Sequence, residues 1–209
     1  MAGKITALRA QKKDQSRVSV YLDDRFAFGL PAIAAASLRL GQSLSDAEIE
    51  ALQEQGGTEA AYEKVLDYLG YRPRSSSEVT AYLRKRGLAD AQIETVCNRL
   101  ERSGLLDDQE FARFWVENRE RFHPRGAQAL RYELRRKGIS AEIVDEALSS
   151  LDSSASAYQA ASNKARQLSH LDRPTFERKL IEYLGRRGFG YEVAREAAAR
   201  HWTEREEGA

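Results

Sequence analysis

The feature that most constrains the fold is a threefold repeat of proline and glycine between residue 73 and residue 188. The repeated residues are Pro73, Pro124 and Pro174, which lie 51 and 50 residues apart, and Gly87, Gly138 and Gly188, each of which follows its proline by 14 residues. Proline is favoured at the start of a helix, where its missing N–H is not needed, and glycine accepts the left-handed conformation just past a helix end. The spacing therefore predicts three equivalent helices of one length.

The residues between these markers repeat as well. Apolar residues stand six and ten positions after each proline: Val79 and Leu83, Leu130 and Leu134, Leu180 and Leu184. This i, i+4 stripe is the buried face of a helix. A patterned helix before each proline and another after each glycine complete units of three helices, over residues 59–106, 107–152 and 153–209, the last with a C-terminal tail. Such repeats predict a mostly α-helical, elongated and curved array.

The first 58 residues follow a different pattern and predict an N-terminal domain with a three-stranded meander. Residues 17–22 and 25–28 alternate apolar and polar side chains, which is the period of a half-buried strand. A first strand over 5–11, turns over 12–15 and 23–24, and no strand after about residue 30 complete the sheet. Because such a small sheet is marginal alone, we expect it to lean on short helices over 31–40 and 46–53. The domain boundary is expected at 55–58.

Composition excludes several classes of protein. The 209-residue chain has 33 basic and 32 acidic side chains and a net charge of +1, so it is not a polycation that wraps nucleic acid. Its single cysteine, Cys97, suits a reducing compartment. No apolar run approaches the length of a membrane span, and Met1–Lys4 does not begin a signal peptide. We expect a monomeric, soluble, cytoplasmic protein without a membrane partner.

The search for catalytic chemistry finds no constellation of residues. His123, His170 and His201 are separated from one another and from Cys97, whereas metal ligands come in clusters. Cys97 lies on an apolar helix stripe and is interpreted as a small core residue. Asp107 and Asp108 stand where a helix begins, which favours capping. The sequence predicts no enzyme activity, no cofactor and no metal site.

Basic residues gather at the two ends of the repeated helices. The candidate partner-binding residues are Arg72, Arg74, Arg84, Lys85, Arg86, Arg119, Arg121, Arg125, Arg135, Arg136, Lys137, Arg186 and Arg187. Cations in the last turn of a helix are favoured by its dipole without any partner, so helix capping is one interpretation. Two or three cations in tandem, repeated at regular intervals, favour a solvent-facing binding surface. The sequence leaves both interpretations open.

Several segments together resemble the bacterial RecX family. They are Tyr21–Phe26, Tyr68–Ser75, Leu83–Leu88, Gly104–Asp108 leading to Phe111 and Ala112, Glu133–Ile139, Ala147–Leu148 and Gly188–Glu192. The resemblance spans nearly the whole chain. It implies three tandem three-helix repeats and a non-enzymatic negative regulator of the RecA recombinase. The expected partner is the RecA filament on single-stranded DNA, in whose groove the protein would lie and whose ATPase, strand-exchange and coprotease activities it would inhibit.

The alternative is a helix-turn-helix protein that acts directly on DNA. A helix that ends at Gly87 and is followed by a helix over 91–102 has the order of that motif. Against this, Glu94 stands in the second helix, which has little base-reading chemistry. Weak direct DNA binding through the basic clusters stays open. Because every repeat has nearly equal numbers of acidic and basic residues, a protein partner is favoured.

Overall fold

The computed structural model describes residues 3–12 and 14–207 and is mostly helical, at 64%. The chain forms two compact units, one made of residues through Arg72 with Val79–Leu106, and the other of Pro73–Glu78 with the residues from Asp107 onward. The first unit contains an antiparallel sheet. Its strands are β1 (Gly3–Ala10), β2 (Arg17–Leu22), β3 (Arg25–Pro31) and β4 (Ser43–Leu44), in the order β3-β2-β1-β4.

The sheet follows the predicted meander with one added strand. The turn at Asp23 and Asp24 is confirmed, because both residues have positive φ, 47° and 66°, as a two-residue hairpin of type I′ requires. The prediction that no strand follows residue 30 is wrong, since β4 pairs with the start of β1. A two-residue strand has too few positions for period-two alternation to reveal it. The predicted turn over 12–15 includes Lys13, which lies outside the described residues.

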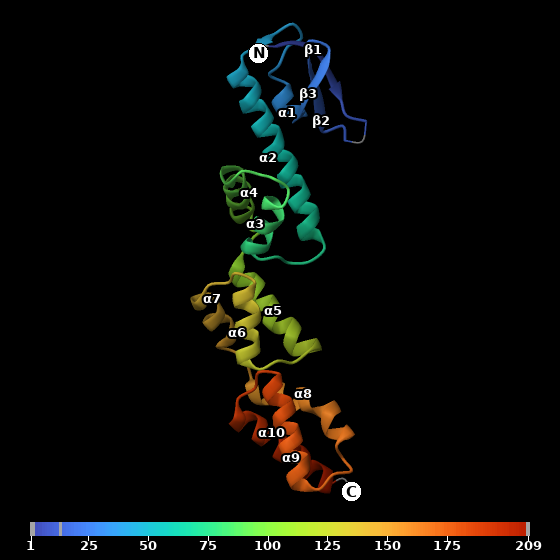
Figure 1. Cartoon of the computed structure of the whole chain (residues 1–209), viewed down its shortest axis with the longest axis vertical. Coiled ribbons are helices and arrows are strands. Elements are labelled where there is room, and N and C mark those ends of the chain that lie inside the picture. Colours follow the sequence, from blue (N-terminus) through green and yellow to red (C-terminus); the bar gives the residue numbers. More distant parts are fainter. Residues whose placement is uncertain (1–2, 13, 208–209) are drawn as a thin grey trace. The chain divides into compact units, whose positions relative to one another are not determined.

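The helices that follow the sheet differ from the expected short pair. α1 (Ala32–Ala35) is a single turn, and α2 runs without a break from Asp46 to Gly70. The prediction of a helix ending at residue 53 is therefore wrong, and residues 55–58, where we expect the domain boundary, lie inside this helix and not in a loop. Ser45 and Glu48 form a capping box at the start of α2. Figure 1 shows α2 beside the sheet and then continuing as the first helix of the first repeat.

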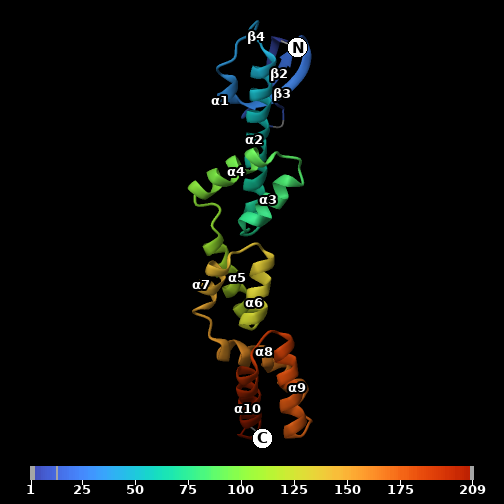
Figure 2. The ribbon, with the colours of Figure 1, turned by 60° about the vertical axis from the view of Figure 1, so that its left-hand side comes forward.

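A close backbone approach explains why α2 contains glycine. A Cβ atom built on Gly56 would lie 2.3 Å from the carbonyl oxygen of Gly29 in β3. The glycine that reads as a linker therefore lets a helix flank touch a strand. The sheet core, which includes Ile5, Val20 and Leu30, packs against the same helix. Figure 2 shows α2 next to β2 and β3 from a second side.

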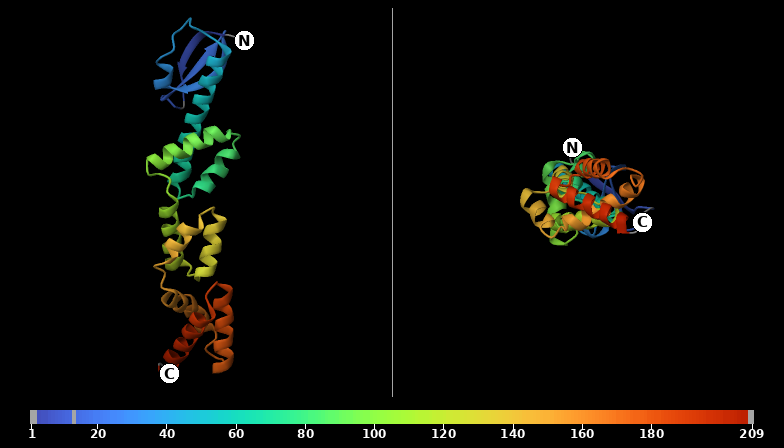
Figure 3. Two further views of the ribbon diagram at one scale, coloured as in Figure 1. Left: turned by 90° about the vertical axis from the view of Figure 1, so that its left-hand side faces the viewer. Right: turned by 90° about the horizontal axis from the view of Figure 1, so that it is seen from below.

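The three-helix repeats are confirmed. The first consists of the C-terminal part of α2 with α3 (Ser76–Arg84) and α4 (Asp90–Arg102); the second of α5 (Asp108–Phe122), α6 (Ala127–Arg136) and α7 (Ala141–Leu148); the third of α8 (Ser153–Gln167), α9 (Arg173–Arg186) and α10 (Tyr191–Glu207). Figure 3 shows α8, α9 and α10 from another side. The predicted stripe residues of α3, α6 and α9 are fully buried.

The glycines that end the central helices match the prediction, but the prediction of one common length is wrong, since α3, α6 and α9 have 9, 10 and 14 residues. Gly87, Gly138 and Gly188 have φ values of 81°, 80° and 84°, which only glycine adopts at little cost. Each repeat has its own buried apolar cluster. Pro174 lies in the first turn of α9, whereas Pro73 and Pro124 precede their helices by a short turn. Those two turns join neighbouring parts of the second unit.

Candidate partner-binding surface

The structure divides the predicted basic residues into two groups by exposure. The exposed group consists of Arg84, Lys85, Arg86, Arg121, Arg135, Arg136 and Arg186. The half-buried group consists of Arg72, Arg74, Arg119, Arg125, Lys137 and Arg187. Sequence reasoning expected all of them to face solvent, because charge pattern alone does not show which cation reaches a carboxylate or a carbonyl.

In the first repeat, the cations at the end of α3 lie on the surface. Arg84 donates to Asp90 at 2.9 Å. The guanidinium of Arg86 lies 3.5 Å from the centre of the Tyr82 ring, which in turn stacks on Tyr68 at 4.1 Å. A planar guanidinium over an aromatic face is held by cation–π attraction. The stack fixes the direction of Arg86 and leaves it exposed.

In the second repeat, Glu133 of α6 collects several donors. Trp115 donates its indole N–H to Glu133 at 2.8 Å, and Arg119 donates to the same carboxylate oxygen at 2.7 Å. Arg125 lies 4.0 Å from the other oxygen. Arg119 also lies over the Trp115 ring. These two arginines therefore hold α5 and the turn before α6 to α6 itself.

Lys137 makes the clearest departure from the expected exposed surface. Its ammonium lies 2.6 Å from a carboxylate oxygen of Glu78, with side-chain exposures of 25% and 16%. The carbonyl oxygen of Lys137 accepts from the hydroxyl of Ser75 at 2.7 Å. Ser75 and Glu78 also form a capping box at the start of α3. Lys137 thus joins the end of α6 to the turn that opens α3.

The third repeat makes an equivalent junction with the second. The backbone N–H of Gly126 donates to the carbonyl oxygen of Arg187 at 3.0 Å, and Arg187 donates to the carbonyl oxygen of Pro124 at 3.4 Å. Gly126 stands two residues after its proline, as Ser75 does, and Arg187 directly precedes its glycine, as Lys137 does. The common spacing was a signal for this junction that sequence reasoning missed.

Exposed aromatic residues accompany some of the exposed cations and were also missed. Tyr132 is 64% exposed and lies beneath Arg136, and Phe122 is 58% exposed and lies beside Arg121. Tyr71 is 86% exposed. Their signal in the sequence was an aromatic residue on the polar side of a helix stripe.

The residues considered for catalysis have structural roles instead. Asp107 caps α5 by accepting from two backbone N–H groups, as predicted. His201 stacks on Tyr158 and donates to its carbonyl oxygen at 3.0 Å. Burial raises the pKa of the half-buried Cys97 thiol, so less of it is the reactive thiolate. Within residues 3–12 and 14–207, no group of three or more His, Cys, Asp or Glu side chains is placed to hold a metal ion.

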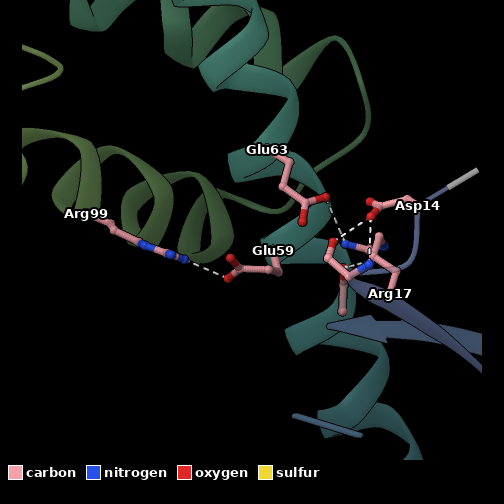
Figure 4. Close-up of polar contacts among 7 residues, drawn as sticks. Asp14, Arg17, Glu59, Glu63 and Arg99 are labelled. Carbon is pink, nitrogen blue, oxygen red and sulfur yellow. Dashed lines mark hydrogen bonds and ion pairs between the residues drawn. The ribbon is translucent and has the colours of Figure 1, made fainter. Parts of the chain in front are cut away.

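Polar contacts also hold the N-terminal sheet and α4 to α2 (Figure 4). Arg17 of β2 donates to Glu63 at 3.1 Å and to the carbonyl oxygen of Gly56 at 3.2 Å. On another part of α2, Glu59 accepts from Arg99 at 2.6 Å, and this hydrogen bond raises the pKa of Arg99. Both arginines are structural, and neither was singled out from the sequence. None of the helices in the described ranges has the length and apolar character needed to span a bilayer.

Comparison with known protein families gives a match for the N-terminal sheet domain and one for each of the three helical repeats. The matches are to the regulatory protein RecX N-terminal domain over residues 3–45, and to the first, second and third three-helix domains of RecX over 61–100, 107–148 and 152–198. The chain belongs to the RecX family. RecX proteins are non-enzymatic regulatory proteins, which agrees with the prediction of no catalytic activity.

Individual RecX proteins resemble the chain over most of its length. The regulatory protein RecX of Bacillus licheniformis is 33% identical over 98% of this chain and 80% of its own length. That of Prosthecochloris aestuarii is 39% identical over 66% of this chain and 91% of its own. A crystal structure of regulatory protein RecX superposes with a TM-score of 0.73 at 26% identity, covering 91% of this chain and 96% of the solved one.

Proposed function

We propose that this RecX family chain is a negative regulator of the RecA recombinase that binds along the groove of the RecA filament on single-stranded DNA. Bound there, it inhibits the ATPase, strand-exchange and coprotease activities of RecA. The observation that carries the proposal is the family match, which extends through the sheet domain and all three helical repeats. Because a filament is built of repeated subunits, we expect this chain to bind it through a surface that recurs from repeat to repeat.

The exposed cations supply such a recurring surface. Arg84 ends α3 and is followed directly by Lys85, Arg135 and Arg136 end α6, and Arg186 ends α9, at matching positions. One to three exposed positive charges at each helix end can meet acidic patches on successive subunits of a protein filament. Four of the half-buried cations act indirectly, because they hold the helices that present the exposed ones: Arg119, Arg125, Lys137 and Arg187.

The test is the DNA-dependent ATPase activity of RecA, titrated with this protein. The double variant Arg135→Glu/Arg136→Glu reverses two exposed charges and should inhibit RecA far less than the unchanged chain does. The matched control is Arg113→Glu/Arg131→Glu, which makes the same charge change on other exposed side chains of the second repeat and should inhibit normally. Equal inhibition by both double variants would contradict the proposed surface.

Direct DNA binding is the second candidate, favoured by the exposed aromatic rings next to Arg121 and Arg136. Single-stranded DNA is bound by such combinations of cations and stacking platforms. Anisotropy of a labelled oligonucleotide across a salt series distinguishes the two. Loss of two phosphate contacts in Arg135→Glu/Arg136→Glu would flatten the salt dependence by roughly 0.7 per contact. A flattened slope with unchanged RecA inhibition would favour the DNA-binding function.

A further inference from the structure

The two junctions of the second unit show what covers the end of a central helix in this fold. At the end of α6, the turn that opens α3 donates a hydroxyl to the carbonyl of Lys137. At the end of α9, the turn that opens α6 donates an N–H to the carbonyl of Arg187. In both, the donor stands two residues after a proline, in a turn of sequence Pro–X–Ser or Pro–X–Gly. The last carbonyls of a helix lack partners within it, and these turns supply them.

The glycines at these helix ends lie directly against the incoming turn. A Cβ atom on Gly138 would lie 2.4 Å from the Cβ of Ser77, and one on Gly188 would lie 2.5 Å from the backbone nitrogen of Ala129. The end of α3 is different: a Cβ on Gly87 would meet nothing within 4 Å in the described part of the chain. Lys85, Arg86 and Gly87 are all exposed. The end of α3 is therefore the uncovered counterpart of two covered sites.

Arg86 lies over a tyrosine ring of its own helix, as Arg187 does at the covered end of α9. The guanidinium of Arg187 lies 4.7 Å from the centre of the Tyr183 ring and still reaches the carbonyl of Pro124. Arg86 lies 3.5 Å from the Tyr82 ring, at the matching position in the first repeat. The stack holds its side chain along the helix end before any partner arrives, which lowers the entropy lost on binding.

We propose that the end of α3, at Arg86 and Gly87, is a docking site for the N-terminal turn of a helix from another protein. The turn has the form Pro–X–Ser or Pro–X–Gly and carries an acidic residue three positions further on. That acid corresponds to Glu78, which pairs with Lys137 at the equivalent site. The basic side chains at the end of α3 complement the negative charge of this acid. The same acid is favoured in the first turn of its own helix, where the helix dipole is positive.

A second copy of this chain does not provide the required turn. The turns that open α3 and α6 are already used within the molecule. The start of α9 has Phe176 where α3 has Ser75, and Lys179 where α3 has Glu78. Phe176 is buried in its own repeat, and Lys179 would face the cations of α3. Charge therefore favours a different protein over head-to-tail assembly.

The probe is a blocked peptide with the sequence of residues 72–84, which contains the turn that covers α6. It is titrated into the full-length, ¹⁵N-labelled protein, and the amide signals of Gly87 and Leu88 are followed. We expect saturable shifts at millimolar peptide, since a short helix forms only marginally in isolation. Arg86→Glu should weaken binding about fivefold, the upper end for a partly exposed ion pair. Lys85→Glu, which changes the charge equally at the adjacent position, should weaken it less than twofold.

A charge swap tests whether the peptide binds as its own turn does on α6. A peptide with Glu78→Lys should bind the Arg86→Glu protein better than it binds the unchanged protein. Circular dichroism of each variant confirms that the helices are retained. Absence of saturable shifts at Gly87, shifts confined to Gly138, or equal losses for Arg86→Glu and Lys85→Glu would overturn the proposal. So would sedimentation showing a dimer of the chain that Arg86→Glu abolishes.

Discussion

The two compact units hold their parts together in different ways. In the first, a sheet and a three-helix repeat share one continuous helix, α2. The sheet contacts the flank of that helix, where Gly56 approaches β3 and Arg17 reaches both Glu63 and the Gly56 carbonyl. Because the shared helix does not end at the joint, it leaves no row of unpaired backbone groups there that the sheet would have to satisfy.

In the second unit, the joints are made at helix ends. The carbonyls of Lys137 and Arg187 would be left over by their own helices, and the turns carrying Ser75 and Gly126 satisfy them. The carbonyls left unpaired at a helix end therefore also determine which turn fits against that end. Both kinds of joint depend on glycine, in one case on a helix flank and in the other at a helix cap.

The largest expected effect comes from Gly126→Ala in the second unit. A Cβ at this position would lie 2.0 Å from the carbonyl oxygen of Gly188, so the backbones must separate. We expect a loss of about 3 kcal/mol in the free energy of unfolding, as for severe overpacking. The chain's two tryptophans, Trp115 and Trp202, lie in this unit and report its urea unfolding by fluorescence.

The control for this variant is Gly185→Ala. Gly185 lies in α9, and an added Cβ would meet nothing within 4 Å among the described residues. Alanine in a helix is favoured over glycine, so this change should raise stability by about 0.5 kcal/mol. Equal destabilisation by the two substitutions would show that the Gly126 contact does not join the repeats.

A smaller effect is expected from Gly56→Ala in the first unit. The added Cβ would lie 2.3 Å from the carbonyl oxygen of Gly29, but the helix gains about 1 kcal/mol from alanine. We expect a net loss of about 2 kcal/mol. The single cysteine, Cys97, lies in this unit, and its labelling rate reports opening of the first repeat.

The two glycine variants together test whether the joints are independent. Gly56→Ala should speed Cys97 labelling and leave the tryptophan transition in place, and Gly126→Ala should do the reverse. Changes that always appear together in both signals would mean that the two units unfold as one, contrary to the distinction between the joints.

Lys137→Glu should have the next effect, because it places two carboxylates together at the end of α6. The pair of Lys137 with Glu78 is neither fully buried nor freely exposed, so we expect a loss of about 1.5 kcal/mol, between the values for surface and buried pairs. Arg136→Glu reverses a neighbouring exposed charge and should cost about 0.5 kcal/mol or less. Urea midpoints followed by tryptophan fluorescence compare them, and equal midpoints would contradict the junction role of Lys137.

The repeats could be predicted from sequence because they depend on local rules. The proline and glycine positions mark helix ends, and apolar residues at i and i+4 mark the buried face, as Leu130 and Leu134 show. The continuous helix α2 could not be predicted in this way. Two adjacent glycines favour a linker by local propensity, and only the approach of β3 to Gly56 explains a helix there.

The candidate surface could be predicted only in part, for a related reason. Arg136 and Lys137 are neighbouring cations at one helix end, yet one is exposed and the other pairs with Glu78, 59 residues earlier in the chain. Long-range pairing of this kind leaves no signal within a single helix. Its trace in the sequence is the shared position of Lys137 and Arg187 directly before their glycines, and the partner Glu78 is seen only in the structure.

The smallest expected effect is a pH dependence of stability that arises from a surface contact inside the third repeat. Unlike the joints, this contact does not connect one part of a unit to another. Hydrogen bonds from Tyr158 and then from Arg200 lower the pKa of Glu204. Because the folded state holds this proton less tightly than the unfolded state, the contact stabilises the protein above the unfolded pKa of about 4.3. That contribution is lost as the pH falls through the lower folded pKa. Glu204→Gln should therefore lose less stability than the unchanged chain between about pH 5 and about pH 3.

Tyr158→Phe provides the matched variant, since it removes the larger cause of the shift and keeps the ring that stacks on His201. Its acid loss should lie between those of Glu204→Gln and the unchanged chain, because Arg200 still donates to Glu204 at 2.9 Å. Urea unfolding followed through Trp202, on the same helix as Glu204, measures all three proteins. Since Glu204 is a surface group and no joint depends on it, Cys97 labelling should be unchanged in every variant. Parallel acid losses in all three proteins would mean that the Tyr158–Glu204 hydrogen bond does not persist in solution.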